Sequence, residues 1–264
     1  MKGSVHVSSG LRSLCEDAAR RIVDKALDAV AARGRFTLVL SGGSSPKHLY
    51  ELLATPEWRD RLDWSKVHLF WEDDRYVPPD DPRSNYRMVR EALLDKIAIP
   101  EDNIHRMRTE LPRPEQTAQV YEDEIRAVLR SENTFPSFDF VVLGLGENGH
   151  TASLFPHRPA LRERSKLVVA DFVPEVNMHR VTMTAPLLNA ARTVAFFVSG
   201  RSKADVVHQV IAGPHRPEDL PAQLIAPAGD LLWLMDAEAA AKLPSGVFTE
   251  IDREPWSRGA PGTR

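Results

Sequence analysis

The sequence predicts an α/β protein of three layers, in which helices cover both faces of a mostly parallel sheet. Apolar runs of strand length alternate with amphipathic, helix-like stretches along most of the chain. Strands of a parallel sheet are buried on both faces and therefore appear as nearly unbroken apolar runs. A length of 264 residues suits one such domain with room for a minor lobe.

The order of the elements follows from this alternation. An alanine-rich amphipathic stretch over 13–32 precedes the strand FTLVL (36–40), and a helix over 46–54 has Pro46 in its first turn. Further strands are predicted over 67–71, 138–144, 192–200 and 230–236. Further helices are predicted over 84–96, 114–130 and 201–212, and an alanine-rich helix behind the last strand.

Two segments depart from this pattern. The stretch 156–180 is less regular, with LVVA (167–170) among several prolines, and is compatible with a small accessory β-lobe. The residues 251–264, which include DREPWSRGAPGTR, are polar and rich in helix breakers. We therefore expect a single α/β domain over 1–250 and a flexible C-terminal tail over 251–264.

Charge and composition argue against several classes of partner. Lys and Arg total 34 and Asp and Glu total 37, a net charge of −3, so no basic field points to nucleic acid or a membrane surface. No apolar run approaches the ~20 residues of a membrane span, and MKGSVHVSSG lacks the apolar core of a signal peptide. The single Cys15 fits a reducing compartment. We expect a cytoplasmic protein that is a monomer or a weak homo-oligomer.

The turn SGGSSP (41–46) is a candidate phosphate cradle. It follows a strand and precedes a helix, where backbone N–H groups and the helix N-terminus attract anions. The alternative is a tight turn in which Ser44 or Ser45 is the helix N-cap. The spacing is not that of a Walker loop. The candidate binding residues here are Ser41, Gly42, Gly43 and Ser44.

The acidic run EDDR (72–75) follows the next strand. Such runs are usually solvated loops, but this one lies where ligand sites form in parallel sheets. Ser84 reads as the N-cap of the following helix. Asn85 is then either structural or a residue that lines the site.

The stretch GLGENGH (144–150) carries the glycine spacing of a dinucleotide-binding fingerprint, and Asp171 lies at about the distance expected for the ribose-binding acid. However, Pro156 and Pro159 interrupt the helix that a βαβ unit requires. The favoured alternative is a glycine-shaped turn that presents His150.

His150 is a candidate general base, because a neutral imidazole at a strand end can take a proton from water. No HExxH pattern accompanies it, which gives metal binding little support. The nucleophile elbow GxSxG is also absent. The segment HRVTMT (179–184) alternates like a strand and has Arg180 at its start, and Arg201 and Lys203 lie at a predicted strand-to-helix junction, where cations suit a phosphate.

Together these segments resemble the 6-phosphogluconolactonases. The segments are SGGSSP, DDRYVPPDDPRSN, GLGENGHTASLFP, RVTMT, VSGRSKA and PAQLI…GDLLWLMDAEAA, in the family's order over about residues 10–240. The resemblance implies the sugar-phosphate isomerase and deaminase type of fold and hydrolysis of 6-phospho-D-glucono-1,5-lactone. It also implies that neither cofactor nor metal takes part.

The resemblance further implies roles for individual residues. His150 is the general base, Asp73 and Arg75 belong to the acidic-arginine motif, and Arg180 and Lys203 bind phosphate. Asp74, Asn148 and His157 stand where the family usually has Glu, Asp and Gly. The expected chemistry is attack of water on C1, with the imidazole oriented by Asp73 or by another acid. If the imidazole is unperturbed, the rate should rise with pH as it deprotonates near pH 6–7. The expected oxyanion donors are the backbone N–H groups of Gly146 to Gly149 or the Asn148 side chain.

Three other functions compete with this one. A glucosamine-6-phosphate deaminase has a similar histidine loop but typically continues with IAFNEP, where this chain has TASLFP. A sugar-phosphate sensor without turnover would be expected to carry an additional DNA-binding or partner domain, for which no segment is long enough. The third alternative is a nicotinamide-dependent oxidoreductase, and this hypothesis rests on the glycine fingerprint.

Overall fold

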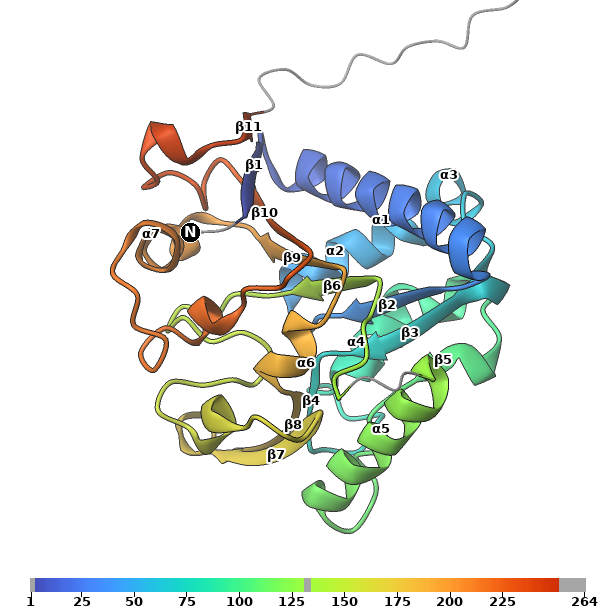
Figure 1. Cartoon of the computed structure of the whole chain (residues 1–264). Coiled ribbons are helices and arrows are strands. Elements are labelled where there is room, and N and C mark those ends of the chain that lie inside the picture. The colour runs from blue at the N-terminus through green and yellow to red at the C-terminus, as the bar shows by residue number, and fades with distance from the viewer. Residues whose placement is uncertain (1–2, 131–133, 252–264) are drawn as a thin grey trace, which may run out of the picture.

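An eight-stranded parallel sheet forms the centre of the computed structural model, which describes residues 3–130 and 134–251 (Figure 1). Its strand order is β11-β1-β10-β9-β6-β2-β3-β5, and all neighbouring strands pair in parallel. The strands are β1 (Ser4–Ser8), β2 (Phe36–Leu40), β3 (Val67–Trp71), β5 (Ile104–His105), β6 (Phe140–Leu143), β9 (Thr193–Val198), β10 (Asp230–Asp236) and β11 (Glu250–Ile251).

Helices cover both faces of this sheet, as predicted. They are α1 (Leu11–Arg33), α2 (Ser44–Leu53), α3 (Pro56–Arg59), α4 (Asn85–Ala92), α5 (Pro114–Leu129), α6 (Ala185–Asn189) and α7 (Ala204–Ala212). Short 3₁₀ turns complete the set: η1 (Trp64–Lys66), η2 (Leu94–Lys96), η3 (Glu101–Asn103), η4 (Pro159–Arg162), η5 (Pro174–Val176), η6 (Arg201–Lys203), η7 (Pro221–Leu224) and η8 (Ser245–Val247).

The hydrophobic core is divided between the two faces of the sheet. Successive side chains of a strand point to opposite faces, so in β6 Phe140 joins the core under α1, α2 and α4, whereas Val141 joins the core under α5, α6 and α7. Residues of β9 divide in the same way. Burial on both faces explains why these strands are continuously apolar in the sequence.

A second, antiparallel sheet of β4 (Asp73–Arg75), β8 (Met178–Met183) and β7 (Val168–Val173) confirms the predicted accessory β-lobe. The chain leaves the large sheet at Glu72. The Glu72 N–H donates to Leu40 O at 3.0 Å, and the Glu72 carbonyl accepts from Met183 N–H at 2.8 Å. Residues 73–75 were expected to be a loop, but pairing with β8 makes them a strand.

Several local predictions need correction. The alanine-rich segment after β10 forms turns rather than a helix, because Pro244 follows Leu243 directly and leaves only a short run for a helix. The helix predicted over 84–96 ends at Ala92 and continues as η2. The strands β1, β5 and β11 were not predicted. The predicted tail lies outside the described residues except for Ile251, which pairs with Val7.

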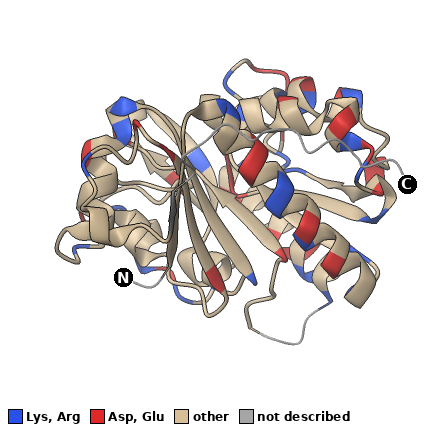
Figure 2. Ribbon diagram, turned by 90° about the horizontal axis from the view of Figure 1, so that it is seen from above, with Lys and Arg blue, Asp and Glu red and all other residues tan. Residues whose placement is uncertain are grey.

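Acidic and basic residues are interspersed along the helices, as the ribbon in Figure 2 shows. This distribution agrees with the small net charge of −3. Within the described ranges, no helix is long and apolar enough to cross a membrane.

Candidate active site

A cleft of about 250 Å³ opens at the edge of the sheet where β2, β3, β6 and β9 end. As predicted, the loops that follow these strands converge there, since parallel strands end at a common edge. The predicted site residues that line the cleft are Ser41, Gly42, Gly43, Ser44, Asp73, Arg75, Asn85, Gly146, His150, Arg180 and Lys203. Asn148 and Gly149 belong to the same loop but do not line the cleft.

The loop between β6 and His150 is closed by its own backbone. Gly146 N–H donates to His150 O at 2.8 Å, and Gly149 N–H donates to Gly146 O at 2.9 Å. A Cβ atom on Gly146 would lie 2.0 Å from His150 Nδ1, so no larger residue fits beside the imidazole ring. Phe155 stacks on the other side of the ring, with the centroids 4.1 Å apart. The loop therefore fixes the histidine.

The same hydrogen bonds narrow the expected oxyanion site. The N–H groups of Gly146 and Gly149 are occupied within the loop, so they are not available to an oxyanion. Asn148 Oδ1 accepts from His150 Nδ1 at 2.5 Å and from His150 N–H at 3.3 Å. Donation to an oxyanion by the remaining N–H groups of the loop or by Asn148 Nδ2 stays a prediction.

The contact with Asn148 fixes the tautomer of His150. An amide oxygen only accepts hydrogen bonds, so Nδ1 carries the proton and Nε2 keeps its lone pair. Among the described residues, no hydrogen bond or ion pair joins His150 to Asp73. The residue that orients the imidazole is therefore Asn148 rather than Asp73.

Burial lowers the pKa of His150 to about 4. The nearby Asp73 carboxylate opposes this shift, whereas the positive charges of Arg180, Lys203 and Arg75 lower the pKa further. The imidazole is consequently neutral at neutral pH, so the unperturbed imidazole on which a titration near pH 6–7 depended is not what this site provides. A neutral ring with a free Nε2 is the form that accepts a proton.

Asp73 is held in the cleft by several polar groups. Asn85 Nδ2 donates to Asp73 Oδ1 at 2.9 Å, and Ser153 Oγ donates to Oδ2 at 2.5 Å. Arg180 Nη1 lies 3.9 Å from the same Oδ2. Asn85 also accepts from Arg75 Nη1 at 2.6 Å. Asn85 is therefore structural and lines the site, so both readings of this residue hold.

Asp74 turns away from the cleft to the N-terminus of α4. Its carboxyl accepts from Asn85 N–H at 2.7 Å, Tyr86 N–H at 3.1 Å and the Ser84 hydroxyl at 3.1 Å. Ser84 is the N-cap, as predicted. Burial raises the pKa of Asp74 to about 6, although these hydrogen bonds oppose the shift. The acidic run thus divides its side chains between the cleft and the helix that carries Asn85.

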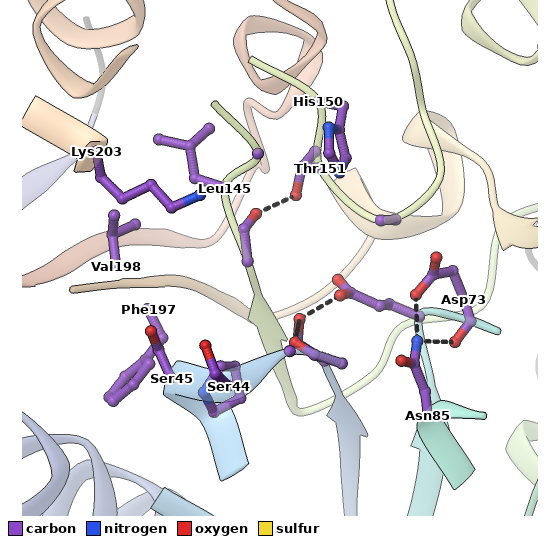
Figure 3. A pocket seen from close by; sticks show the side chains of 18 of the residues that line it. Ser44, Ser45, Asp73, Asn85, Leu145, His150, Thr151, Phe197, Val198 and Lys203 are labelled. Carbon is purple, nitrogen blue, oxygen red and sulfur yellow. Dashed lines mark hydrogen bonds between the residues drawn. The ribbon is translucent and has the colours of Figure 1, made fainter. Parts of the chain in front are cut away.

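Anion-binding groups are present on the side of the cleft formed by α2. Gly43, rather than Ser44 or Ser45, is the N-cap of α2 and has a φ of 102°. The N–H groups of the first helical turn have no partner within the helix. Figure 3 shows Lys203 on the same side as Ser44 and Ser45, with Asp73 and Asn85 on the other side.

Two cations in the cleft, Lys203 and Arg180, have N–H groups that can donate hydrogen bonds to a ligand. Among the described residues, Lys203 forms no ion pair, and the buried Nε of Arg180 has no hydrogen-bond partner. Arg201 is exposed and does not line the cleft.

The glycine fingerprint does not belong to a dinucleotide-binding unit. After Gly149 the chain forms an isolated bridge between Thr151 and Leu154 instead of a helix. The next strand, β7, lies in the small sheet. Asp171 pairs with Arg158 at 2.7 Å. The prolines therefore indicated correctly that the βαβ unit is interrupted.

The sequence alone did not identify Glu72, Ser153 and Phe155 as parts of the site. Ser153 and Phe155 belong to the TASLFP segment; Ser153 contacts Asp73, and Phe155 stacks on the imidazole of His150. Across the described residues, no group of three or more His, Cys, Asp or Glu side chains is arranged to hold a metal ion.

Comparisons with known proteins agree with this arrangement. Residues 10–233 match the model of the family described as glucosamine-6-phosphate isomerases/6-phosphogluconolactonase. A 6-phosphogluconolactonase of Synechocystis is 44% identical over 244 residues, which are 92% of this chain and 99% of that protein. One from Mycobacterium tuberculosis is 38% identical over 253 residues, with 93% and 100% covered.

A solved structure shares the fold. The 6-phosphogluconolactonase from Trypanosoma cruzi superposes with a TM-score of 0.82 at 30% sequence identity, covering 92% of this chain and 97% of that one. The family match spans the strands whose ends form the cleft and the loop that holds His150. The chain therefore belongs to the family of glucosamine-6-phosphate isomerases and 6-phosphogluconolactonases.

Proposed function

We propose that the chain hydrolyses 6-phospho-D-glucono-1,5-lactone to 6-phospho-D-gluconate, in the oxidative branch of the pentose phosphate pathway. The observation that carries the proposal is the neutral His150, held by Asn148 through Nδ1, in a cleft that also contains Lys203, which forms no ion pair among the described residues, and Arg180, whose buried Nε has no hydrogen-bond partner there. The full-length relatives named 6-phosphogluconolactonase support the same reaction.

The proposed first step is attack of water on C1 of the lactone. His150 Nε2 takes a proton from the water while its oxygen bonds to C1, which gives a tetrahedral oxyanion. Arg75, Arg180 and Lys203 compensate this charge through the electrostatic field in the cleft. The bond from C1 to the ring oxygen then breaks, and the imidazolium returns its proton to that oxygen. No covalent enzyme intermediate is required.

We assign the phosphate of the substrate to Lys203 and Arg180, with the turn Ser41–Ser44 and the first turn of α2 as backbone donors. The spare hydrogen-bonding capacity of the two cations and the unpaired N–H groups support this assignment. Asp73 is assigned to the reacting end of the cleft, where Asn85 and Ser153 hold its carboxylate.

A glucosamine-6-phosphate deaminase is the alternative within the family, and it is not favoured. Ser153 and Phe155, which contact Asp73 and His150, come from the TASLFP segment rather than from the sequence typical of deaminases. A nicotinamide-dependent enzyme is disfavoured by the interrupted βαβ unit. Neither NAD nor NADP is expected to raise the melting temperature.

We further propose that the reaction needs no cofactor or metal, because a δ-lactone is an activated ester that a general base can hydrolyse with water. Activity should survive dialysis against a chelator. We propose a cytoplasmic monomer or weak homo-oligomer that binds neither nucleic acid nor membranes, supported by the single Cys15 and the interspersed charges along the helices. Sedimentation at several concentrations tests the oligomeric state.

The decisive assay compares lactone hydrolysis with the spontaneous background. The lactone is generated in place by oxidation of glucose 6-phosphate, and the acid product is detected directly. We expect hydrolysis well above background with the unmodified chain, and strong preference over unphosphorylated gluconolactone. A rate equal to the background would contradict the proposed function.

A further inference from the structure

Glu72 is a buried carboxyl group at the floor of the cleft that the mechanism above does not use. Its residue is only 2% exposed, and it lines the cleft beside Ser41 and Asp73. Its backbone is fixed at the junction of the two sheets by the bonds to Leu40 and Met183. The side chain therefore has little freedom to reach solvent.

No positive charge accompanies this carboxyl group. Within the described ranges, no ion pair involves Glu72, and its Oε2 has no hydrogen-bond partner. The neighbouring carboxylate, Asp73, is already paired with Asn85, Ser153 and Arg180. A second negative charge at this depth would have no ion-pair partner of its own among the described residues, which is costly in a protein interior.

The hydrogen bonds of Ser41 also favour a proton on Glu72. Ser41 Oγ is in close contact with Glu72 Oε1 and lies 3.2 Å from Gly42 O. A hydroxyl group has one hydrogen to donate, so it cannot donate to both oxygens. If Glu72 is protonated, it donates to Ser41 Oγ while the Ser41 hydroxyl donates to Gly42 O, and both contacts are satisfied.

The electrostatics of the site agree with this arrangement. Burial raises the pKa of Glu72 well above its usual range, and the charge of Asp73 raises it further; hydrogen bonds from Ser41 and from the Gly144 backbone oppose this shift without cancelling it. The turn above it, Ser41–Ser44, is assigned to an anionic substrate. An ionised Glu72 would repel that substrate and would remove the donor that holds Ser41.

We propose that Glu72 carries a proton in the functional protein and acts as a positioning residue, a neutral donor that holds Ser41 and the glycine-serine turn in the form that binds a sugar phosphate. This inference rests on the proposed function for its ligand, but the protonation of Glu72 does not. Ionisation of Glu72 at high pH would then weaken binding of the phosphorylated ligand.

Other titrating groups near Glu72 do not produce the same effect. Tyr50, on α2, bonds to the Ser41 backbone and has a pKa raised well above 10 by burial. His150 is neutral above about pH 4. The charged groups that line the cleft from β4, β8 and η6 are Asp73, Arg75, Arg180 and Lys203. Replacing Glu72 alone separates its titration from theirs.

The first test measures the proton directly. An infrared difference spectrum between the unmodified protein and Glu72→Gln should contain the carbonyl band of a protonated carboxyl group at neutral pH. The matched control is Glu57→Gln, which alters an exposed glutamate on α3 and should show only carboxylate bands. Carboxylate bands for Glu72 at neutral pH would overturn the proposal, whether or not the chain hydrolyses the lactone.

The second test measures the consequence for binding, with 6-phospho-D-gluconate as a stable probe in calorimetric titrations at increasing pH. We expect its affinity for the unmodified protein to fall about tenfold or more over the interval in which the acid band disappears. The affinity of Glu72→Gln for the probe should not fall over this pH interval, and Glu72→Ala should bind the probe more weakly than the unmodified protein at every pH. Equal pH dependence in the unmodified protein and Glu72→Gln would overturn the positioning role. Loss of binding in all variants, including Glu57→Gln, would count against the sugar-phosphate site instead.

Discussion

The tautomer of His150 depends on a single neighbour, Asn148, whose neutral amide oxygen contacts Nδ1 and adds no negative charge that would stabilise an imidazolium. The low pKa of about 4 follows from burial and from cations that Asp73 only partly offsets. An amide at this position therefore keeps the base neutral over a wide pH range. The departure of Asn148 from the usual aspartate is thus consistent with a working base.

Asn148→Asp tests this explanation. A carboxylate against Nδ1 favours the imidazolium, so the pKa of His150 should rise toward its ordinary value near 6.5. Because the neutral ring is the active form, kcat/KM rises with pH through this pKa. The ratio of kcat/KM at about pH 5 to that at about pH 7 should therefore fall in the variant. The phosphate of the substrate titrates equally in both proteins and cancels, so an unchanged ratio would contradict the explanation.

The cations of the cleft are tested by Lys203→Ala and Arg180→Ala. Each lost charge-assisted contact to the phosphate is worth about 1.5–3 kcal/mol, so KM should rise roughly 10–150-fold with a smaller change in kcat. The exposed Arg201, replaced by Ala, is the matched control and should change neither constant. A loss confined to kcat in Arg180→Ala would assign that residue to the reacting carbonyl instead of the phosphate.

At the level of single residues, the sequence predicted which residues lie in the cleft, but it did not predict which groups those residues contact. Spacing and strand ends predicted His150, Asp73, Asn85 and Lys203. Asp73 was separated from Asp74 only by the family resemblance, because residues 73–75 form a strand only by pairing with β8, and it is the strand that points adjacent side chains to opposite sides. His157 adopts a φ of 60°, which explains why glycine is usual there.

At the level of elements, the glycine loop after β6 is built around the volume of the histidine ring. Gly149 has a φ of 81°, and Gly146 leaves no room for a Cβ atom. The loop resembles a dinucleotide-binding fingerprint because both need close backbone approach. In this chain the group that approaches is a side chain of the loop itself rather than a cofactor.

Gly146→Ala is the corresponding prediction. The new methyl group would overlap the imidazole ring, so His150 must leave its position and lose the bond to Asn148. Misplacement of a catalytic group by about 1 Å can reduce turnover about 10²-fold, so kcat should fall by up to that factor. Gly10→Ala is the matched control, because nothing lies within 4 Å of its Cβ position. Normal kcat in folded Gly146→Ala would show that the close contact is unnecessary.

Elements were predicted well where their signal is local and poorly where it depends on distant partners. Strands β2, β3, β6, β9 and β10 are long apolar runs, and their positions in the sequence were clear. By contrast, β5 has two residues and β1 alternates with polar side chains. Both are strands because a neighbouring strand supplies hydrogen bonds, which the sequence of either segment does not reveal.

For the whole molecule, the cleft unites segments that are far apart in the chain. Ser41, Glu72, Gly144 and Ser199 meet because β2, β3, β6 and β9 run in parallel and end at one edge. A ligand in the cleft therefore contacts groups that only the folded chain brings together. The alternation of strands and helices predicted this convergence. The order of the strands and the position of the small sheet became known only from the structure.

Ligand binding should accordingly stabilise the entire fold. At about 100 times its dissociation constant, 6-phospho-D-gluconate should add about 2.7 kcal/mol to the free energy of unfolding. This raises the melting temperature by several degrees, which differential scanning fluorimetry can measure. Unphosphorylated gluconate at the same concentration is the control and should have little effect. Equal stabilisation by both acids would contradict a phosphate site.

The central claim is that this loop exists to hold a neutral His150 as the general base, and the most direct measurement is the kcat of His150→Ala on protein shown by circular dichroism and thermal melting to be folded. General base catalysis by one side chain contributes about 10²–10⁴-fold. The account predicts a fall in kcat of that size with KM little changed and with 6-phospho-D-gluconate still bound. Turnover near that of the unmodified protein would contradict it.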